Sequence, residues 1–182
     1  MLNVLAACFG LQLAGVRSPL LVTSLLGASA LFCEAMVYAD TRRDFWALRW
    51  TLPKFLGTAL ILGAALKLAT APCAAAAWGL LSATLLKLGW EIAIIKYGDE
   101  EQPNQLQRTA RLQTGRLRPV LAIRLMLSLT GGVFLPFVML AGNFSWPMCF
   151  TAGVLCLVGE YAERHLFFTS VAPDKMPGNI GA

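Results

Sequence analysis

Long apolar stretches separated by shorter polar segments dominate the chain. A helix needs ~20 residues to cross a hydrocarbon core of ~30 Å, and each stretch is near that length. The predicted complete spans are Pro19–Tyr38, Lys54–Ala71, Cys73–Lys96, Val120–Ala141 and Trp146–Phe168. Met1–Val16 is also apolar but shorter, and it predicts a short or partial N-terminal helix. The pattern therefore predicts an all-α, polytopic transmembrane helical bundle that forms one integral membrane domain over residues 1–182.

Two polar segments interrupt or follow these spans. The segment 97–119 begins with acidic residues and Pro103, and it predicts a loop with a short helix at Gln105–Leu112. Residues 169–182 predict a C-terminal tail. The long polar loop could form a cap over a partner protein, or it could be a mobile connection.

Composition agrees with a membrane protein. Hydrophobic residues make up 57% of the chain, charged residues only 14%, and the mean hydropathy is +0.64. A soluble domain usually has about 25% charged residues, so a soluble fold would lack the polar surface it needs. The first sixteen residues lack the basic start of a signal peptide, which favours a helix that stays in the protein.

The positions of the basic residues predict the orientation, because Lys and Arg near helix ends are retained on the cytoplasmic side. One set of loops and helix ends carries Arg42, Arg43, Arg49, Lys54, Lys96, Arg108, Arg111, Arg116, Arg118, Arg124, Arg164 and Lys175. The other side carries only Arg17 and Lys67. We therefore expect a multi-pass protein of the bacterial inner membrane with a cytoplasmic C-terminus. The net charge of +5 then favours anionic lipid, with nucleic acid a remote second interpretation.

The chain lacks the residues that usually hold redox cofactors. Its five cysteines form no CxxC pair or metal-binding cluster, and His165 is the only histidine. Cys149 and Cys156 are seven residues apart, so they share a helix face but lie beyond disulfide reach. Phosphate-binding loops and hydrolase motifs are also missing from the sequence. We therefore expect no haem, iron–sulfur cluster or metal in this chain, and any redox centre would belong to a partner.

Ionisable residues inside the apolar stretches are functional candidates, because a charge facing lipid is costly. Lys87 and Glu91 are four residues apart, so we expect them to face the interior and each other. This pair could serve function or only fix helix packing, at about even odds. Glu34 could carry protons or could be a hydrogen-bonded packing residue.

The last predicted span ends in a concentrated polar group. Glu160 and Arg164 can pair at a spacing of four, while Tyr161, His165 and Phe168 form a neighbouring stripe. A site that binds an aromatic head group and exchanges protons needs a titratable residue beside aromatic rings. Snorkelling side chains and an interfacial aromatic belt would give a similar composition.

The segment Asp40–Trp50 combines arginines with aromatic residues, which is the composition of protein–protein hot spots. The residues are Arg42, Arg43, Arg49, Phe45, Trp46 and Trp50. Retention of positive charge and anchoring at the membrane interface explain the same residues without a partner. We favour docking, because a family resemblance falls on this segment.

Four segments resemble the membrane anchor subunits of dimethyl sulfoxide reductase-type enzymes. They are MVYADTRRDFW at 36–46, TLPKFLGTALILG at 51–63, RTARLQTGRLRP at 108–119, and the ending at 159–177 with ERHLFF at 163–168. The resemblance runs from about residue 18 to the C-terminus. It implies a subunit that holds a molybdopterin catalytic subunit and an iron–sulfur electron-transfer subunit at the membrane. Such a subunit exchanges electrons with quinone or quinol and carries no metal itself.

The family has more spans than this chain, which matches only the last five. Quinone-site residues of relatives are associated largely with earlier helices, so none is transferred to positions here. The site could be built differently, another chain could supply helices, or the chain could be a truncated product. From side-chain chemistry we nominate Glu160 and His165 for proton handling, Tyr161 for ring contact, and Glu91 and Glu34 as deeper alternatives.

Two other classes of protein compete with the anchor. A small secondary transporter would use Lys87 and Glu91 at a midplane site, although no repeated half is evident. A truncated, non-redox membrane protein is the second. The sequence identifies neither the terminal substrate nor the direction of electron flow.

Overall fold

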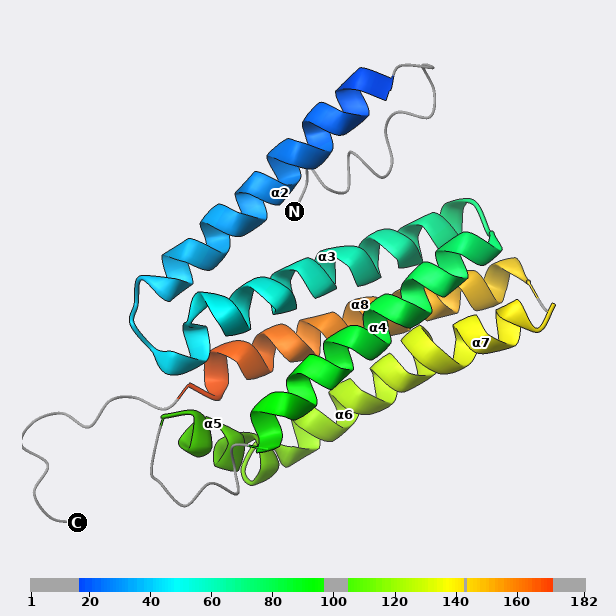
Figure 1. Cartoon of the computed structure of the whole chain (residues 1–182). Helices are drawn as coiled ribbons and strands as arrows, with labels where there is room; N and C mark the ends of the chain where they lie inside the picture. Colours follow the sequence, from blue (N-terminus) through cyan, green and yellow to red (C-terminus); the bar gives the residue numbers. More distant parts are fainter. Residues whose placement is uncertain (1–16, 97–104, 143, 172–182) are drawn as a thin grey trace, which may run out of the picture.

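The computed structural model describes residues 17–96, 105–142 and 144–171, and its regular elements are all helical (Figure 1). In chain order they are α2 (Arg17–Ala39), η2 (Asp44–Trp46), α3 (Leu48–Thr70), α4 (Ala74–Ile95), α5 (Gln105–Thr114), α6 (Arg118–Leu129), η4 (Thr130–Phe134), α7 (Leu135–Leu140) and α8 (Trp146–Thr169). The all-α prediction is confirmed for this part of the chain. The short N-terminal helix predicted at Met1–Val16 lies outside the described residues, as does most of the C-terminal tail.

Three helical segments are long and apolar enough to cross a membrane, which supports a membrane protein. They are Val22–Ala39, Leu48–Thr70 and Arg118–Leu140. The last combines α6, the π-helical turn η4 and α7 into one continuous run. The short helix predicted in the polar segment is confirmed as α5.

The start of α3 corrects a predicted boundary. The predicted span begins at Lys54, whereas α3 begins at Leu48 and contains Pro53. Pro53 is the sixth residue of α3, beyond the first turn, so the helix lacks one backbone hydrogen bond there. Arg49 and Trp50, predicted in a loop, therefore lie in the first turn of a helix.

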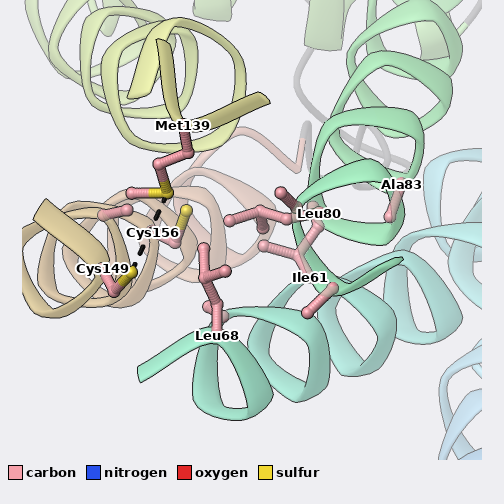
Figure 2. Close-up of a cluster of buried hydrophobic side chains, with 11 residues drawn as sticks. Ile61, Leu68, Leu80, Ala83, Met139, Cys149 and Cys156 are labelled. Carbon is pink, nitrogen blue, oxygen red and sulfur yellow. Dashed lines mark hydrogen bonds between the residues drawn. The ribbon is translucent and has the colours of Figure 1, made fainter. Parts of the chain in front are cut away.

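Small residues let the helices α3, α4, α7 and α8 pack around an apolar core (Figure 2). Gly131 in η4 is so close to α8 that a Cβ built there would lie 2.7 Å from the Cβ of Leu155. A Cβ on the neighbouring Gly132 would collide with Thr84 of α4. The core includes Cys149 and Cys156, so the prediction that both face one side of a helix is confirmed.

Helix α2 stands apart from this bundle over much of its length and joins it at one end (Figure 1). At that junction the ring of Tyr38 lies 5.5–5.9 Å from the rings of Trp46, Phe55, Phe167 and Phe168. The same end carries η2, α5 and the C-terminus of α8, and we call it the capped end. A hydrogen bond of 3.0 Å from Gln113 Nε2 to Ser170 Oγ ties α5 to α8.

Candidate functional site: a buried ion network between two cavities

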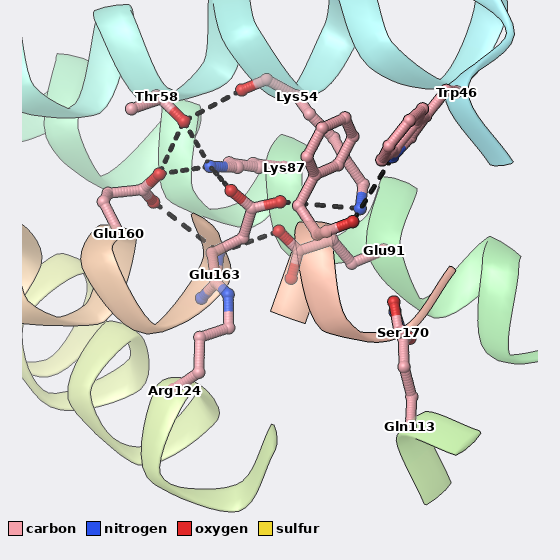
Figure 3. Close-up of polar contacts among 11 residues, drawn as sticks. Trp46, Lys54, Thr58, Lys87, Glu91, Gln113, Arg124, Glu160, Glu163 and Ser170 are labelled. Atoms are coloured by element: carbon pink, nitrogen blue, oxygen red, sulfur yellow. Dashed lines mark hydrogen bonds and ion pairs between the residues drawn. The ribbon is translucent and has the colours of Figure 1, made fainter. Parts of the chain in front are cut away.

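Four helices bring ionisable side chains together inside the bundle (Figure 3). The members are Lys54 of α3, Lys87 and Glu91 of α4, Arg124 of α6, and Glu160 and Glu163 of α8. The hydroxyls of Thr58 and Ser128 complete this set, which we call the ion network. Its three cations and three carboxylates balance one another in formal charge. Such balance is what allows ionised groups to be buried at all.

Lys87 lies at the centre of the ion network, and its side chain is 1% exposed. Its ammonium donates hydrogen bonds to Glu160 Oε2 and, at 2.7 Å, to Thr58 Oγ1. Thr58 Oγ1 in turn lies 2.6 Å from Glu160 Oε2. Gly57 makes room for the lysine stem, because a Cβ there would lie 3.0 Å from Lys87 Cδ. A small residue one position before Thr58 thus lets the lysine cross from α4 toward α8.

Arg124 forms the second half of the ion network. Its guanidinium donates a 2.8 Å hydrogen bond to Glu91 Oε1 and another to Ser128 Oγ, and it lies 3.6 Å from Glu160 Oε1. Glu160 therefore bridges Lys87 and Arg124, one cation on each carboxylate oxygen. Breaking one partner of such a pair leaves an uncompensated buried charge.

Glu163 connects the remaining lysine. Its Oε1 lies 3.5 Å from Lys54 Nζ, and its Oε2 lies 3.7 Å from Lys87 Nζ. The Lys54 ammonium also lies 4.4 Å from the centre of the Phe45 ring, a cation–π contact. Lys54 therefore links the ion network to the aromatic side chains of the capped end.

The predicted pairing within one helix is wrong for Lys87 and Glu91. Both face the interior as expected, but Lys87 pairs with Glu160 of α8 and Glu91 pairs with Arg124 of α6. Glu160 likewise pairs with Lys87 and Arg124, while the Arg164 guanidinium lies 3.9 Å from the centre of the Phe55 ring. Spacing defines a shared helix face, but the neighbouring helices here offer partners at closer range.

Sequence reasoning missed Lys54, Thr58, Arg124 and Glu163. Lys54 and Arg124 entered the prediction as charges that orient the chain, but they are only 4% and 1% exposed. Their positions could have identified them as buried residues, because Arg124 lies inside a predicted span and Lys54 begins one. The rule that charges inside apolar stretches seek partners applied to them as well.

The ion network lies well inside α8, away from its C-terminal end. Glu160 lies nine residues before Thr169, the last residue of α8. At ~1.5 Å per residue this distance is about 14 Å along the helix axis.

A lateral groove of about 790 Å³ lies between α2, α3 and α8 on one side of the ion network. Its walls are mainly apolar, and its polar lining comes from Glu34, Thr58, Glu160, Tyr161 and Arg164. The structure thus brings three nominated residues, Glu34, Glu160 and Tyr161, to one surface. Tyr161 is 78% exposed on the bundle, so its phenol is free to contact a ligand or lipid.

A smaller cavity of about 250 Å³ lies on the other side, toward the capped end, and we call it the polar cavity. Leucine and isoleucine side chains form most of its walls, and the polar lining residues for which we name it are Lys54, Glu91, Gln113, Arg124 and Glu163. The nominated residue Glu91 therefore belongs to this cavity and not to the groove. His165 is exposed on α8 and is part of neither lining, so the structure does not bring it together with the other candidates.

The predicted docking segment is largely folded into the capped end. Phe45 and Trp50 are buried, and Trp46 donates a 3.3 Å hydrogen bond from Nε1 to the carbonyl of Phe167. Arg43 is half-buried and lies 4.8 Å from the centre of the Trp46 ring, whereas Arg42 and Arg49 are exposed.

Arg42 also has a φ of 57°, in the left-handed region that glycine usually occupies. The exposed docking candidates are therefore arginines, while Phe45 and Trp50 have packing roles.

Comparisons with protein-family models, curated proteins and solved structures found no match for the chain. The case for a function therefore depends on the geometry of its own residues and on the resemblance of its segments 36–46, 51–63, 108–119 and 159–177 to anchor subunits.

Proposed function

We propose that this chain is the membrane anchor subunit of a molybdopterin oxidoreductase complex and that its lateral groove exchanges quinone and quinol with the membrane. In this proposal electrons pass between the bound quinone and the iron–sulfur subunit of the complex. Molybdopterin and the iron–sulfur clusters belong to the partner subunits. The observation that carries the proposal is the groove, whose apolar walls end at the buried Glu160 and Thr58.

The groove suits a quinone in size and chemistry. Its volume of about 790 Å³ falls within the ~300–1,000 Å³ typical of small-molecule sites. Apolar side chains from α3 and α8 can hold an isoprenoid tail, and the exposed Tyr161 phenol can donate a hydrogen bond to a ring oxygen. Glu160 supplies a carboxylate for proton exchange, the chemistry that quinol oxidation requires.

We further propose five complete spans, with α4 and α8 crossing the membrane beside the three apolar segments. These helices have 22 and 24 residues, a length sufficient for a ~30 Å core. Four of their charged residues, Lys87, Glu91, Glu160 and Glu163, have partners in the ion network, which lowers the usual cost of charge in lipid. The exposed arginines gather at the capped end, for example Arg42, Arg111 and Arg116, and this supports a cytoplasmic capped end in a bacterial inner membrane.

The partner subunits would dock on this capped end. Arg42 and Arg49 are exposed there, and arginine is favoured at interfaces that contain carboxylates. The groove extends to Phe55 and Phe168 near the same end. The groove therefore reaches from Glu160 toward the side of the membrane where the iron–sulfur subunit would bind.

One observation favours a second function. A charge-balanced network buried at membrane depth, with a cavity on either side, is also a feature of small secondary transporters. A transporter would bind its substrate without a redox partner. A truncated, non-redox protein would have neither a partner nor a flux.

Gentle purification of the complex from its native membrane tests the proposal. We expect molybdenum, iron and quinone to be recovered with the chain in fixed ratio. A metal-free chain that drives substrate flux in proteoliposomes would favour the transporter, and one that does neither would favour the truncated protein. As a control, the same preparation with Arg42→Glu and Arg49→Glu should lose the metals and keep the quinone.

A further inference from the structure

The polar cavity contains two buried polar atoms that lack hydrogen bonds. Arg124 Nε is a donor and Glu163 Oε1 is an acceptor, and neither has a hydrogen bond to a described residue. The contact of Glu163 Oε1 with Lys54 Nζ, at 3.5 Å, is an ion pair. Both residues line the polar cavity. Buried polar groups in native proteins are nearly always satisfied, by protein or by ordered water. Because Arg124 and Glu163 both line one cavity of about 250 Å³, water bound in that cavity is the partner that would satisfy the two atoms.

The ion network separates this cavity from the groove and also connects the two. Glu160 lines the groove, Glu163 lines the polar cavity, and the Lys87 ammonium lies between them. Lys87 Nζ is hydrogen-bonded to Glu160 Oε2 and lies 3.7 Å from Glu163 Oε2. The other oxygen of Glu163 is the one without a hydrogen bond. Glu160 thus contacts Lys87 through one carboxylate oxygen and Arg124 through the other. Glu163 contacts Lys87 through one oxygen and Lys54 through the other.

We propose that Glu160, Lys87 and Glu163 form a proton path between the lateral groove and water in the polar cavity. This inference depends on the proposed quinone function. When quinol is oxidised, its two O–H bonds break, and two electrons pass to the iron–sulfur centre of the partner subunit. Glu160 accepts each of the two protons in turn.

The transfer through the ion network conserves charge. Lys87 gives a proton to Glu163 and takes one from Glu160, after which Glu163 releases its proton to water in the cavity. The other charged groups in contact are Lys54, beside Glu163, Arg124, beside Glu160, and Glu91, beside Arg124. They compensate the charge of the two carboxylates before and after each transfer. Quinone reduction follows the same path in reverse.

The variant Glu163→Gln tests this path in the intact complex, with quinol-dependent turnover as the measurement. General acid–base groups typically contribute ~10²–10⁴-fold to rate. We expect turnover to fall by about 10²-fold, with a larger ratio of rates in H₂O and D₂O, because proton transfer becomes limiting. Binding of a short-chain quinone analogue should stay within about twofold of the parent, since Glu163 lies outside the groove lining. Glu163→Asp keeps the carboxylate and should restore much of the rate.

The outcomes separate this inference from the proposed function. If the parent complex binds and oxidises quinol and Glu163→Gln does so at the parent rate with an unchanged isotope effect, the path is wrong while the groove stands. If the parent complex binds no quinone analogue, the proposed function fails and the path fails with it. Loss of turnover that Glu163→Asp does not restore, with no change in the isotope effect, would also contradict the path.

A second measurement needs no variant. Radiolytic hydroxyl-radical labelling of the complex reports side chains that lie beside bound water. We expect oxidation of Leu125, which lines the polar cavity, and protection of Leu62, an equally half-buried leucine of the groove. Protection of Leu125 would show a dry cavity and overturn the path.

Discussion

The chemistry of the site depends on how single buried charges are compensated. Glu160 is 4% exposed and has Lys87 on one oxygen and Arg124 near the other. The Lys87 side chain is 1% exposed and lies beside two carboxylates and Thr58. In a low-dielectric interior such contacts are strong, and the loss of one is felt by all its neighbours.

Glu160→Gln is expected to lower quinol-dependent turnover by about 10²-fold, because it removes the proton acceptor at the groove. His165→Ala lies outside both cavity linings, and we expect turnover near that of the parent. Rates are measured in the intact complex at equal enzyme content. Parent-like turnover in both variants would disprove the assignment of Glu160.

Lys87→Met should destabilise the protein by about 3–5 kcal/mol, the usual cost of leaving a buried partner uncompensated. Thermal unfolding in detergent measures this loss. Lys67→Met is the matched control at the opposite end of the bundle, where Lys67 is only half-buried. A change within about 0.5 kcal/mol is expected there. Equal shifts for the two lysines would argue against a structural role for the ion network.

The sequence predicted some residues of the site but not their interaction partners, for a physical reason. Glu160, Tyr161 and Glu34 were found because charged and aromatic residues in apolar stretches are conspicuous. Their partners were not found, because spacing along one helix says nothing about which other helix lies opposite. The pairing of Lys87 with Glu160 spans 73 positions, and only the packing of α3, α4 and α8 brings the two together.

At the scale of elements, close helix contacts hold the ion network in place. Gly131 and Gly132 bring η4 against α8 and α4, and Gly159 lets α8 approach Ser128 of α6. The π-helical turn at η4 changes the helix register next to these contacts. The π-helical turn was not predicted from the sequence.

Gly131→Ala should therefore weaken the contact between η4 and α8, since its new Cβ would lie 2.7 Å from Leu155 Cβ and 3.1 Å from the Ala152 carbonyl. We expect a loss of about 1–3 kcal/mol, as for other overpacked cores. Gly89→Ala on α4 is the control, because nothing lies within 4 Å of its added Cβ. It should gain about 0.5–1 kcal/mol from helix propensity. The same sign for both changes in thermal unfolding would contradict this packing.

The junction of α2 is the second element-scale feature, because the groove exists only while α2 stays docked at the capped end. Tyr38→Ala removes ring contacts at 5.5–5.9 Å and should widen the distance distribution between spin labels at positions 22 and 154. Phe32→Ala, an exposed ring on the same helix, should leave the distribution unchanged. An unaltered distribution in Tyr38→Ala would mean that other contacts hold α2.

At the scale of the whole molecule, hydrophobic pattern and helix length predicted most of the architecture. The predicted limits of α2, α4 and α8 agree with the observed ones to within two residues, as expected where apolar stretches end at polar turns. The start of α3 was misplaced because proline and charge resembled a boundary. The groove could not be predicted, since it depends on how far α2 diverges from α3 and α8.

The measurement that tests the central claim most directly is photo-cross-linking of an azidoquinone in native membranes, followed by mapping of the labelled peptides. The account predicts labelling of the groove lining, especially Tyr161 and Leu157 on α8 and Leu62 on α3, with loss of label when excess unmodified quinone competes. Labelling confined to peptides outside the groove, or label that quinone does not displace, would contradict the claim that this groove is a quinone site.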